Sequence, residues 1–230
     1  MGQINVIGVE YALSDGRVLL NDVSFRVGDG AKVALIGANG VGKTTLFRMI
    51  AGDLQPDEGQ IIVTGGLGIM RQFIGSIRDE STVRDLLISV SPEKIRNAAE
   101  KLKLAERALE EKNEEREQLA YAEALSEWGD AGGYDQEVLW DMAASKALGK
   151  TFDRVANREV NSLSGGEQKR LVLELLLIGP EEVLILDEPD NYLDVPAKRW
   201  LEEEIRKSKK TVLFISHDRE LLAATATKIV

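Results

Sequence analysis

The chain has 230 residues, of which 43% are apolar, and its 29 Lys and Arg against 39 Asp and Glu give a net charge of −10. This profile is typical of a soluble, globular, intracellular chain, and the absence of Cys excludes a disulfide framework or Cys-ligated zinc. The acidic balance argues against a protein that holds nucleic acid on a broad basic face, because such binding neutralises phosphates with Lys and Arg.

The first 30 residues alternate short apolar runs with turn residues. INVIGVEYAL at 4–13 and VSFRV at 23–27 are rich in β-branched residues and are separated by Ser14-Asp15-Gly16. These runs predict two strands that are joined by a turn.

Three further apolar runs are continuous rather than alternating. AKVALI at 31–36 is followed much later by VLIL at 183–186 and TVLFI at 211–215. Continuous apolar runs are typical of strands that are buried on both faces of a parallel sheet. We therefore expect an α/β fold with its site at the carboxyl ends of these strands.

The octapeptide GANGVGKT at 37–44 follows the first buried run directly and matches G-x-x-x-x-G-K-[ST] in full. Glycines in such a loop let backbone N–H groups turn toward phosphate oxygens at a helix N-terminus. A glycine turn that merely closes a βα unit is the alternative, which eight matched positions disfavour. We expect Lys43 to reach the β- and γ-phosphates and the Thr44 hydroxyl to ligate Mg²⁺. The predicted nucleotide-binding residues of this loop are Gly37, Asn39, Gly40, Gly42, Lys43, Thr44 and Thr45.

Residues 93–128 form a charged stretch without Gly or Pro. Ser91-Pro92 ahead of it is typical of a helix start, with Ser91 as the N-cap and Pro92 in the first helical position. The apolar pattern is lost near Asn113, which predicts a helical hairpin. A segment of this kind is either a solvated helical face or a surface that contacts a partner.

The packing of this hairpin is predicted from the spacing of its apolar residues. Ile95, Leu102 and Leu109 recur every seven residues and indicate the inner face of the first helix. On the second helix, we expect the packed residues to be Leu119, Ala122 and Leu125.

Two more motifs carry chemistry. LSGGEQ at 163–168 opens an apolar helix, and its glycines and Ser164 hydroxyl offer a second place for phosphate. Asp187 and Glu188 stand at the end of the buried run at 183–186, where carboxylates are costly unless a cation or water uses them. Asp187 fits a Mg²⁺-organising carboxylate, and Glu188 fits a base that orients the attacking water.

GANGVGKTT, LSGGEQ and VLILDEPDNYLD, in this order, resemble the motifs of ATP-binding cassette (ABC) ATPases. The resemblance covers essentially the whole chain. It implies a P-loop NTPase fold with a mixed, mainly parallel sheet, an N-terminal antiparallel β subdomain, and an inserted α-helical subdomain with a helical arm. The expected parts of this single domain are a nucleotide-binding core at 1–72 and 180–230 and a helical subdomain at 73–179, which includes the arm at 91–128 and the signature at 163–168.

The resemblance also assigns roles to residues. In ABC ATPases two cassettes sandwich two ATP molecules, so a second cassette is the implied partner, and Ser164, Gly165 and Gly166 would contact its γ-phosphate. Tyr11 matches the aromatic residue that stacks on adenine, although a strand aromatic is also a common core residue. The implied catalytic residues are Glu188, His217 and Gln72, the implied Mg²⁺ ligands are Thr44, Gln72 and Asp187, and the implied D-loop residues are Asn191, Leu193 and Asp194.

The spacing of the motifs favours one branch of the family. Gln72 and Leu163 are 163 − 72 = 91 residues apart, which is long for a transporter cassette, and EPDNYLD is similar to the EPTNHLD of the F subfamily. Asp190 and Tyr192 depart from that pattern, as does the presence of one cassette instead of two. F-subfamily proteins are soluble and act on ribosomes, and some of them give antibiotic resistance. The resemblance therefore implies a cytoplasmic location, a ribosome partner, and a place as the first cassette of a longer protein.

Two alternatives stay open. One is the nucleotide-binding subunit of a membrane transporter. The other is an ATP-gated clamp, in which closure performs the biological function and ATP turnover is incidental. In either case we expect no direct membrane insertion, because the longest apolar run, at 171–179, is interrupted by Glu174 and is too short to span a bilayer.

Overall fold

The computed structural model describes residues 2–230, which form two compact units. The sheet unit comprises residues 2–77 and 164–230, and the helical unit comprises residues 78–163. The helical unit is narrower than the subdomain at 73–179 expected from the sequence. Residues 73–77 belong to the sheet unit, and so does α7 (Gly165–Ile178), which contacts strand β5 (Leu67–Met70).

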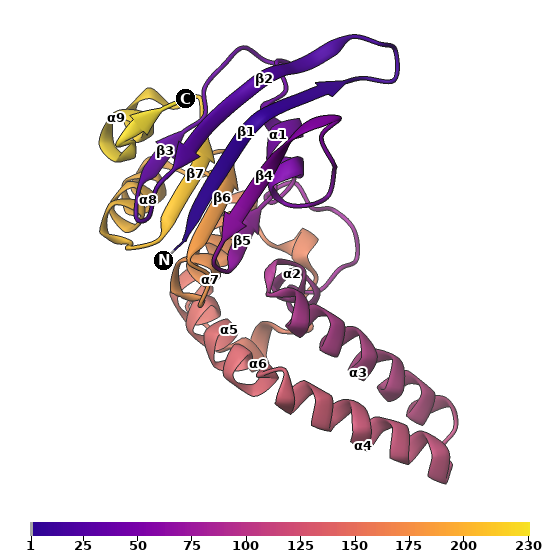
Figure 1. Ribbon diagram of the computed structural model, residues 1–230. Coiled ribbons are helices and arrows are strands. Elements are labelled where there is room, and N and C mark those ends of the chain that lie inside the picture. Colours follow the sequence, from indigo (N-terminus) through magenta and orange to yellow (C-terminus); the bar gives the residue numbers. More distant parts are fainter. Residues whose placement is uncertain (1) are drawn as a thin grey trace. The chain divides into compact units, whose positions relative to one another are not determined.

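The sheet unit contains an antiparallel sheet in the order β2-β1-β4 (Figure 1). Its strands are β1 (Gln3–Ala12), β2 (Val18–Val27) and β4 (Glu58–Thr64). Ile4 and Val6 of β1 face the core, and an irregularity at Gly8, where φ is +54°, brings Val9 to the same side. The two strands predicted at the N-terminus are confirmed, whereas β4 is an addition that the sequence did not reveal.

The second sheet is parallel and has the order β5-β6-β7-β3-β8. Besides β5, its strands are β3 (Lys32–Ala34), β6 (Val183–Asp187), β7 (Thr211–Ile215) and β8 (Lys228–Ile229). Each residue of β6 and β7 is buried, as the continuous apolar runs predict. The three buried strands expected from the sequence are thus confirmed, and they are neighbours in the sheet.

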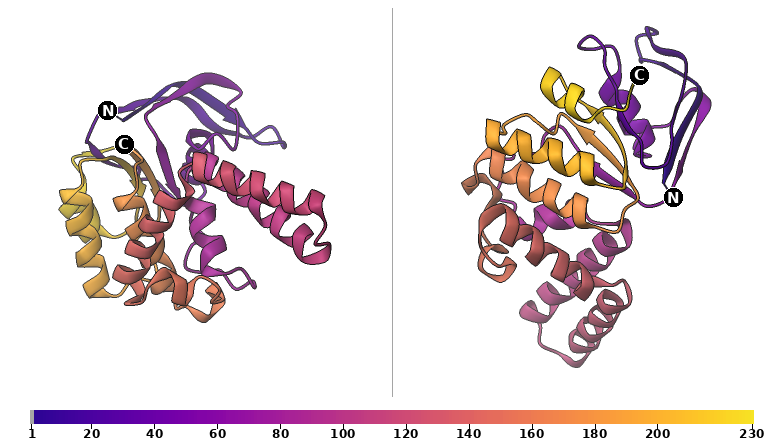
Figure 2. Two further views of the ribbon diagram at one scale, coloured as in Figure 1. Left: turned by 90° about the horizontal axis from the view of Figure 1, so that it is seen from below. Right: turned by 90° about the vertical axis from the view of Figure 1, so that its left-hand side faces the viewer.

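Four helices complete the sheet unit. They are α1 (Lys43–Ile50), α7, α8 (Val195–Lys207) and α9 (Arg219–Thr225). Helix α1 contacts β4 of the antiparallel sheet and β6 of the parallel sheet, so it lies between them. Helix α8 contacts both α7 and α9, and α8 and α9 run side by side in Figure 2. Helix α1 begins at Lys43, shortly after β3 ends at Ala34, so its first turn follows the carboxyl end of that strand.

The helical unit consists of a two-helix arm and the helices at its base. Its helices are α2 (Val83–Val90), α3 (Glu93–Glu111), α4 (Glu115–Asp130), α5 (Gly133–Leu148), α6 (Phe152–Val155) and a 3₁₀ turn at Val160–Ser162. Helices α3 and α4 lie antiparallel, as Figure 1 shows, and are joined by residues 112–114. The hairpin predicted to turn near Asn113 is confirmed.

The inner face of α4 differs from the predicted one. Leu119 and Ala122 are exposed, and Leu125 is half-buried. The buried positions are Ala124 and Trp128, and Tyr121 is half-buried like Leu125; Tyr121, Ala124 and Trp128 recur at three- and four-residue spacing. The predicted face was thus wrong for Leu119 and Ala122, because the aromatic side chain of Trp128 and the small Ala124 supply the buried positions of α4.

Ser91 does not cap α3. Pro92 is the N-cap of α3, and Ser91 is the last, capping residue of α2. The buried Ser91 hydroxyl donates to the Leu87 carbonyl at 2.7 Å and accepts a hydrogen bond from Trp140 Nε1 at 3.2 Å. The predicted cap is wrong because these buried contacts within the helical unit use the hydroxyl instead.

Among residues 2–230, none of the helices combines the length and the apolar character that crossing a bilayer requires.

Candidate functional site

The glycine-rich loop at 37–44 ends at the first turn of α1. Gly42 is the N-cap of that helix and has a φ of +107°, in the left-handed region. A Cβ atom at this position would also lie 3.0 Å from Leu20 Cδ2, so glycine is required for both reasons. The Lys43 ammonium donates to the carbonyls of Gly37 at 2.8 Å and Ala38 at 3.1 Å. The loop thus holds a cation beside the free N–H groups of a helix start.

Thr44 and Asp187 connect this loop with the end of β6. The Thr44 hydroxyl donates to Asp187 Oδ2 at 3.2 Å. Burial raises the pKa of the Asp187 carboxyl, and the hydrogen bond from Thr44 partly opposes that increase. A buried carboxylate whose charge is poorly solvated favours a bound cation.

The oxygen atoms near Asp187 are of the kind that bind Mg²⁺. The Thr44 hydroxyl, the Asp187 carboxylate and the Gln72 side-chain amide supply the oxygen ligands that this hard cation prefers. Within the described residues, no group of three or more His, Cys, Asp or Glu side chains gathers around one point. Mg²⁺ at nucleotide sites needs only one or two carboxylates, because phosphates and water fill its other positions.

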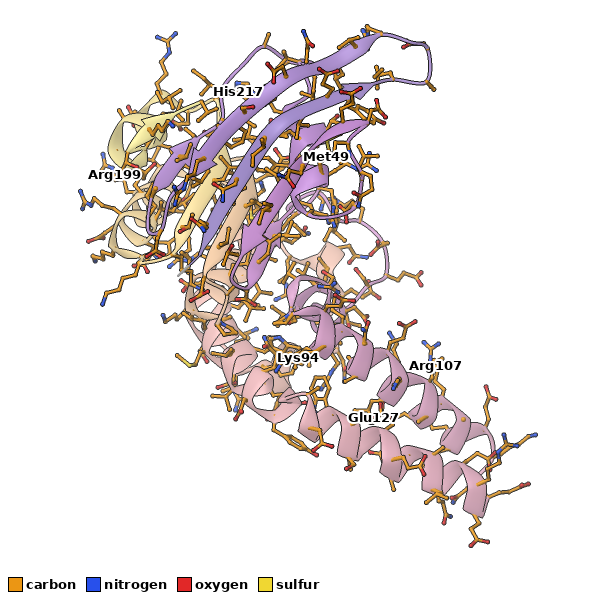
Figure 3. All side chains as sticks on the ribbon, viewed as in Figure 1. Met49, Lys94, Arg107, Glu127, Arg199 and His217 are labelled. Atoms are coloured by element: carbon orange, nitrogen blue, oxygen red, sulfur yellow. The ribbon has the colours of Figure 1, made fainter. Side chains whose placement is uncertain are left out.

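Two side-chain amides hold the Glu188 carboxylate, and His217 lies near it. Its Oε2 accepts hydrogen bonds from Asn191 Nδ2 at 2.6 Å and from Gln72 Nε2 at 3.1 Å. His217 Nε2 lies 3.9 Å from Glu188 Oε1, and the imidazole, labelled in Figure 3, is 55% exposed. Glu188 itself has a φ of +50°, which is unusual for a residue with a side chain. The backbone and the amide donors together aim this carboxylate.

One cavity of about 400 Å³ brings most of the predicted residues together. Its predicted lining residues are Asn39, Gly40, Gly42, Lys43, Thr44, Thr45, Gln72, Asp187, Glu188 and His217. The volume lies in the range of small-molecule sites, and its polar groups are those suited to a polyphosphate with a cation.

Tyr11 is placed elsewhere. Its ring packs against the hydrophobic core, and it pairs with Leu20 on β2. The part of the cavity that β1, β2 and their turn supply is lined instead by Leu13, Arg17 and Leu19. The sequence analysis missed these three residues, although the turn at 14–16 was a signal that the adjacent residues form a hairpin tip.

Ser164 begins α7 as its N-cap. The Ser164 hydroxyl accepts from the Glu167 N–H at 3.2 Å, and the Glu167 carboxylate accepts from the Ser164 N–H at 2.8 Å. Among the described residues that line the cavity with Lys43, Ser164, Gly165 and Gly166 do not appear. The signature therefore forms a separate helix start in the same unit.

The D-loop connects these parts to α8. Leu193 is buried, and Asp194 caps α8 by accepting from the Ala197 N–H at 2.9 Å. Tyr192 has a φ of +68°, and its ring lies against Gly165, where a Cβ atom would be 3.1 Å from Tyr192 Cγ. The turn after Glu188 is thus closely packed on the signature helix.

A family model described as ABC transporter matches residues 20–191. The chain belongs to the ABC family. The family recognised from the motifs is confirmed, and the matched range spans both the glycine-rich loop and the acidic pair of the ABC cassette.

Relatives of this ABC cassette include proteins of resistance and translation. An antibiotic resistance protein of Mycobacteroides abscessus is 58% identical over all of this chain and 42% of its own length. ABC transporter F family member 2 of Arabidopsis thaliana is 34% identical over 94% of this chain and 32% of its own length. The energy-dependent translational throttle protein EttA of Mycobacterium tuberculosis is 30% identical over 90% of this chain and 36% of its own length. The chain thus spans less than half the length of these relatives.

Solved ABC structures share the fold of this cassette. A bacterial Atm1-family ABC exporter with ATP bound superposes with a TM-score of 0.64 and 20% identity, over 99% of this chain and 36% of the exporter chain. A metal-chelate type ABC transporter in an inward-facing conformation gives a TM-score of 0.65 with 19% identity, over 100% of this chain and 79% of the other. The predicted P-loop fold with an antiparallel β subdomain is confirmed.

Proposed function

We propose that this cassette binds ATP with Mg²⁺ and hydrolyses it as part of an ABC-F protein that acts on ribosomes. The observation that carries the hydrolytic part is the Glu188 carboxylate, which Gln72 and Asn191 hold in the same cavity as Lys43. A carboxylate beside phosphate-binding donors suits removal of a proton from an attacking water.

Each residue of the cavity has a task in this proposal. The loop N–H groups and the Lys43 ammonium bind the phosphates, and Thr44, Asp187 and Gln72 hold Mg²⁺. When bound, Mg²⁺ neutralises charge on the phosphate oxygens. Glu188 takes the proton of the attacking water, while His217, 3.9 Å from its second oxygen, hydrogen-bonds the γ-phosphate.

The signature supports a second cassette as the partner. Its helix start has free N–H groups suited to phosphate but does not line the cavity of its own Lys43. A γ-phosphate contact from Ser164, Gly165 and Gly166 would therefore come from another cassette, with two cassettes enclosing two nucleotides.

The ribosome partner is supported by the relatives and by the arm. One relative is named for antibiotic resistance and another for translational throttling. The helices α3 and α4 present charged side chains along their length, among them Arg107 and Glu127 in Figure 3. We expect this arm to contact the ribosome and the protein to work in the cytoplasm.

Two substitutions test the division of labour in the cavity. Lys43→Ala removes the phosphate-bound charge and should weaken ATP binding, whereas Glu188→Gln should retain binding and abolish most turnover. Fluorescent-nucleotide titration gives the affinity, and phosphate release gives the turnover. Equal loss of ATP affinity in both variants would contradict the proposed roles.

Mixing of inactive variants tests the partner cassette. Lys43→Ala chains and Ser164→Arg chains should complement each other, because a mixed pair contains one intact site. Random pairing makes about half of the dimers mixed, so recovery should approach roughly a quarter of wild-type turnover.

Association of the Glu188→Gln variant with ribosomes in the presence of ATP tests the biological partner. Binding to an integral membrane subunit instead would favour a transporter.

A further inference from the structure

Lys169 lies beneath the turn that carries Glu188. It belongs to α7 and is 0% exposed, which is rare for a lysine unless its charge is paired. Its ammonium donates a hydrogen bond to the main-chain carbonyl of Glu188. The lysine thus contacts the backbone of the residue that we assign to proton removal.

Three carboxylates surround this buried ammonium. Burial lowers the pKa of Lys169 to about 8, and the charges of Asp190, Glu188 and Asp187 oppose that decrease, with Asp190 the strongest of the three. At neutral pH the side chain therefore remains largely an ammonium ion.

Asp190 is the matching buried anion. It is 5% exposed, and its Oδ1 atom has no hydrogen-bond partner among the described residues. An isolated buried carboxylate is costly, and the ammonium groups of Lys169 and Lys198 both interact with Asp190 electrostatically. Asp190 is also one of the positions at which the sequence departs from the EPTNHLD pattern, where threonine would carry no charge.

The carbonyl that Lys169 holds belongs to a constrained backbone. A left-handed φ of +50° at Glu188 costs free energy and persists only where surrounding contacts impose it. Asn191 and Gln72 hold the side chain of Glu188. The carbonyl of the peptide that follows Glu188 accepts from the Lys169 ammonium and, at 3.3 Å, from the Asn191 N–H. Rotation of that peptide would redirect the carboxylate.

The stem of Lys169 is also fixed. A Cβ atom at Gly75 would lie 3.1 Å from Lys169 Cγ, so the lysine packs against the loop that begins at Gln72. This close packing limits the conformations of the side chain and fixes the position of its ammonium.

We propose that Lys169 is a positioning residue that holds the backbone of Glu188 in its catalytic conformation, with Asp190 as its counter-charge. The proposal rests on the proposed function of Glu188 in ATP hydrolysis. Lys169 is not assigned any contact with the nucleotide, so its role should appear in turnover and not in ATP affinity.

The first test is Lys169→Met, which retains the apolar stem and removes the ammonium. We expect kcat to fall at least about tenfold while the dissociation constant for ATP changes less than about twofold. The melting temperature should also fall, because Asp190 then loses the buried charge of Lys169 and keeps only that of Lys198.

The double variant Lys169→Met with Asp190→Asn separates positioning from stability. Removal of both charges should restore most of the melting temperature, whereas turnover should stay low because the Glu188 carbonyl then keeps only the Asn191 N–H and still lacks the charged donor. A merely structural lysine would regain both.

Lys32→Met is the matched control. Lys32 is 5% exposed, and its ammonium also donates to main-chain carbonyls, those of Gly30 at 2.9 Å and Lys210 at 2.5 Å. It has no contact with Glu188, so this variant should lose stability and retain kcat.

The outcomes are distinct. The proposal is overturned if Lys169→Met retains wild-type kcat or if the double variant regains turnover. It is also overturned if the effects of Lys169→Met and Asp190→Asn on the free energy of unfolding are additive. A wild-type chain that binds ATP without turnover contradicts the proposed function and the positioning role with it. In that case, comparison of the unfolding free energies of the two single variants and the double variant still shows whether Lys169 and Asp190 interact, because it requires no activity.

Discussion

The central strands and the helical arm bury their residues in different ways. Every residue of β6 and β7 is buried, whereas α3 buries only Ile95, Ala98 and Ala99, and α4 only Ala124 and Trp128. The buried residues of the arm lie at the start of α3 and the end of α4, which are adjacent in an antiparallel hairpin. Strands β6 and β7 are therefore stabilised along their whole length, whereas the arm is stabilised at the end where α3 begins and α4 finishes.

An aromatic cluster stabilises this end of the arm, which is called its root. The Trp140 ring lies 5.9 Å from Trp128 and 5.3 Å from Phe152, measured between ring centroids. The Arg84 guanidinium stacks over Phe152 at 5.1 Å from the ring centroid. The hydrogen bond from Trp140 to Ser91 adds a directional contact to this packing.

Trp140→Ala should have the largest effect on the stability of the helical unit relative to the sheet unit. Removal of a fully buried indole costs about 3–5 kcal/mol, so we expect the helical unit to lose protection while the sheet unit still binds ATP. Hydrogen exchange of each unit and nucleotide titration provide the measurement. Tyr134→Ala removes an exposed ring of the same helix and serves as the control. Loss of ATP binding in the Trp140 variant would show that the two units unfold together.

Leu213→Ala tests the other side of the comparison. Leu213 is buried in the middle of β7, so its truncation should destabilise the sheet unit by about 2–5 kcal/mol. We expect ATP affinity to fall in parallel with the midpoint of urea unfolding. Val18→Ala, at an exposed position of β2, should leave both unchanged, and an equal effect of the two substitutions would be inconsistent with a core role for β7.

Ser91→Ala should have an intermediate effect. It leaves the buried Trp140 N–H and the Gln136 amide, whose Nε2 lies 3.3 Å from Ser91 Oγ, without this acceptor. A buried donor without a partner costs about 1–3 kcal/mol. Thermal unfolding of the variant gives the value, with Ser89→Ala as a less buried serine control. A stabilised Ser91 variant would mean that the hydroxyl is more costly to bury than its hydrogen bonds repay.

Shortening of the arm should have the smallest effect. Replacement of residues 104–123 by a short Gly/Ser linker removes no fully buried residue and should change stability by less than about 1 kcal/mol. Replacement of the whole of 93–128 removes Ile95 and Trp128 and should unfold the helical unit. Calorimetry of both variants distinguishes the cases, and similar losses in the two would show that the outer half is also needed.

Contiguous features of this fold were predictable from the sequence, and features that depend on distant contacts were not. The buried strands follow from continuous apolar runs, whereas β5 has only the four residues LGIM and becomes a strand by pairing with β6. The prediction for Ser91 failed for the same reason. A Ser-Pro pair is typical of a helix start, but Trp140, 49 residues later, binds the hydroxyl.

The candidate site divides in the same way. Lys43, Thr44 and Asp187 lie in motifs whose local sequence implies their chemistry. Arg17 and Leu19 reach the same cavity only because of how β1 and β2 pair, and Lys169 reaches Glu188 because α7 packs beneath the turn. Each of these residues belongs to an ordinary stretch when the sequence is viewed alone.

The strand order of the parallel sheet has a consequence for folding during synthesis. Strand β3, which leads into the glycine-rich loop, pairs on one side with β7 and on the other with β8, both from the last twenty residues of this sequence. The helical unit is one continuous segment, so all of its own residues are made before β7 and β8. A nascent chain can therefore complete the arm and its root while β3 still lacks both neighbours. The competence to bind a nucleotide is therefore acquired after the arm has formed, although the glycine-rich loop is made before the arm.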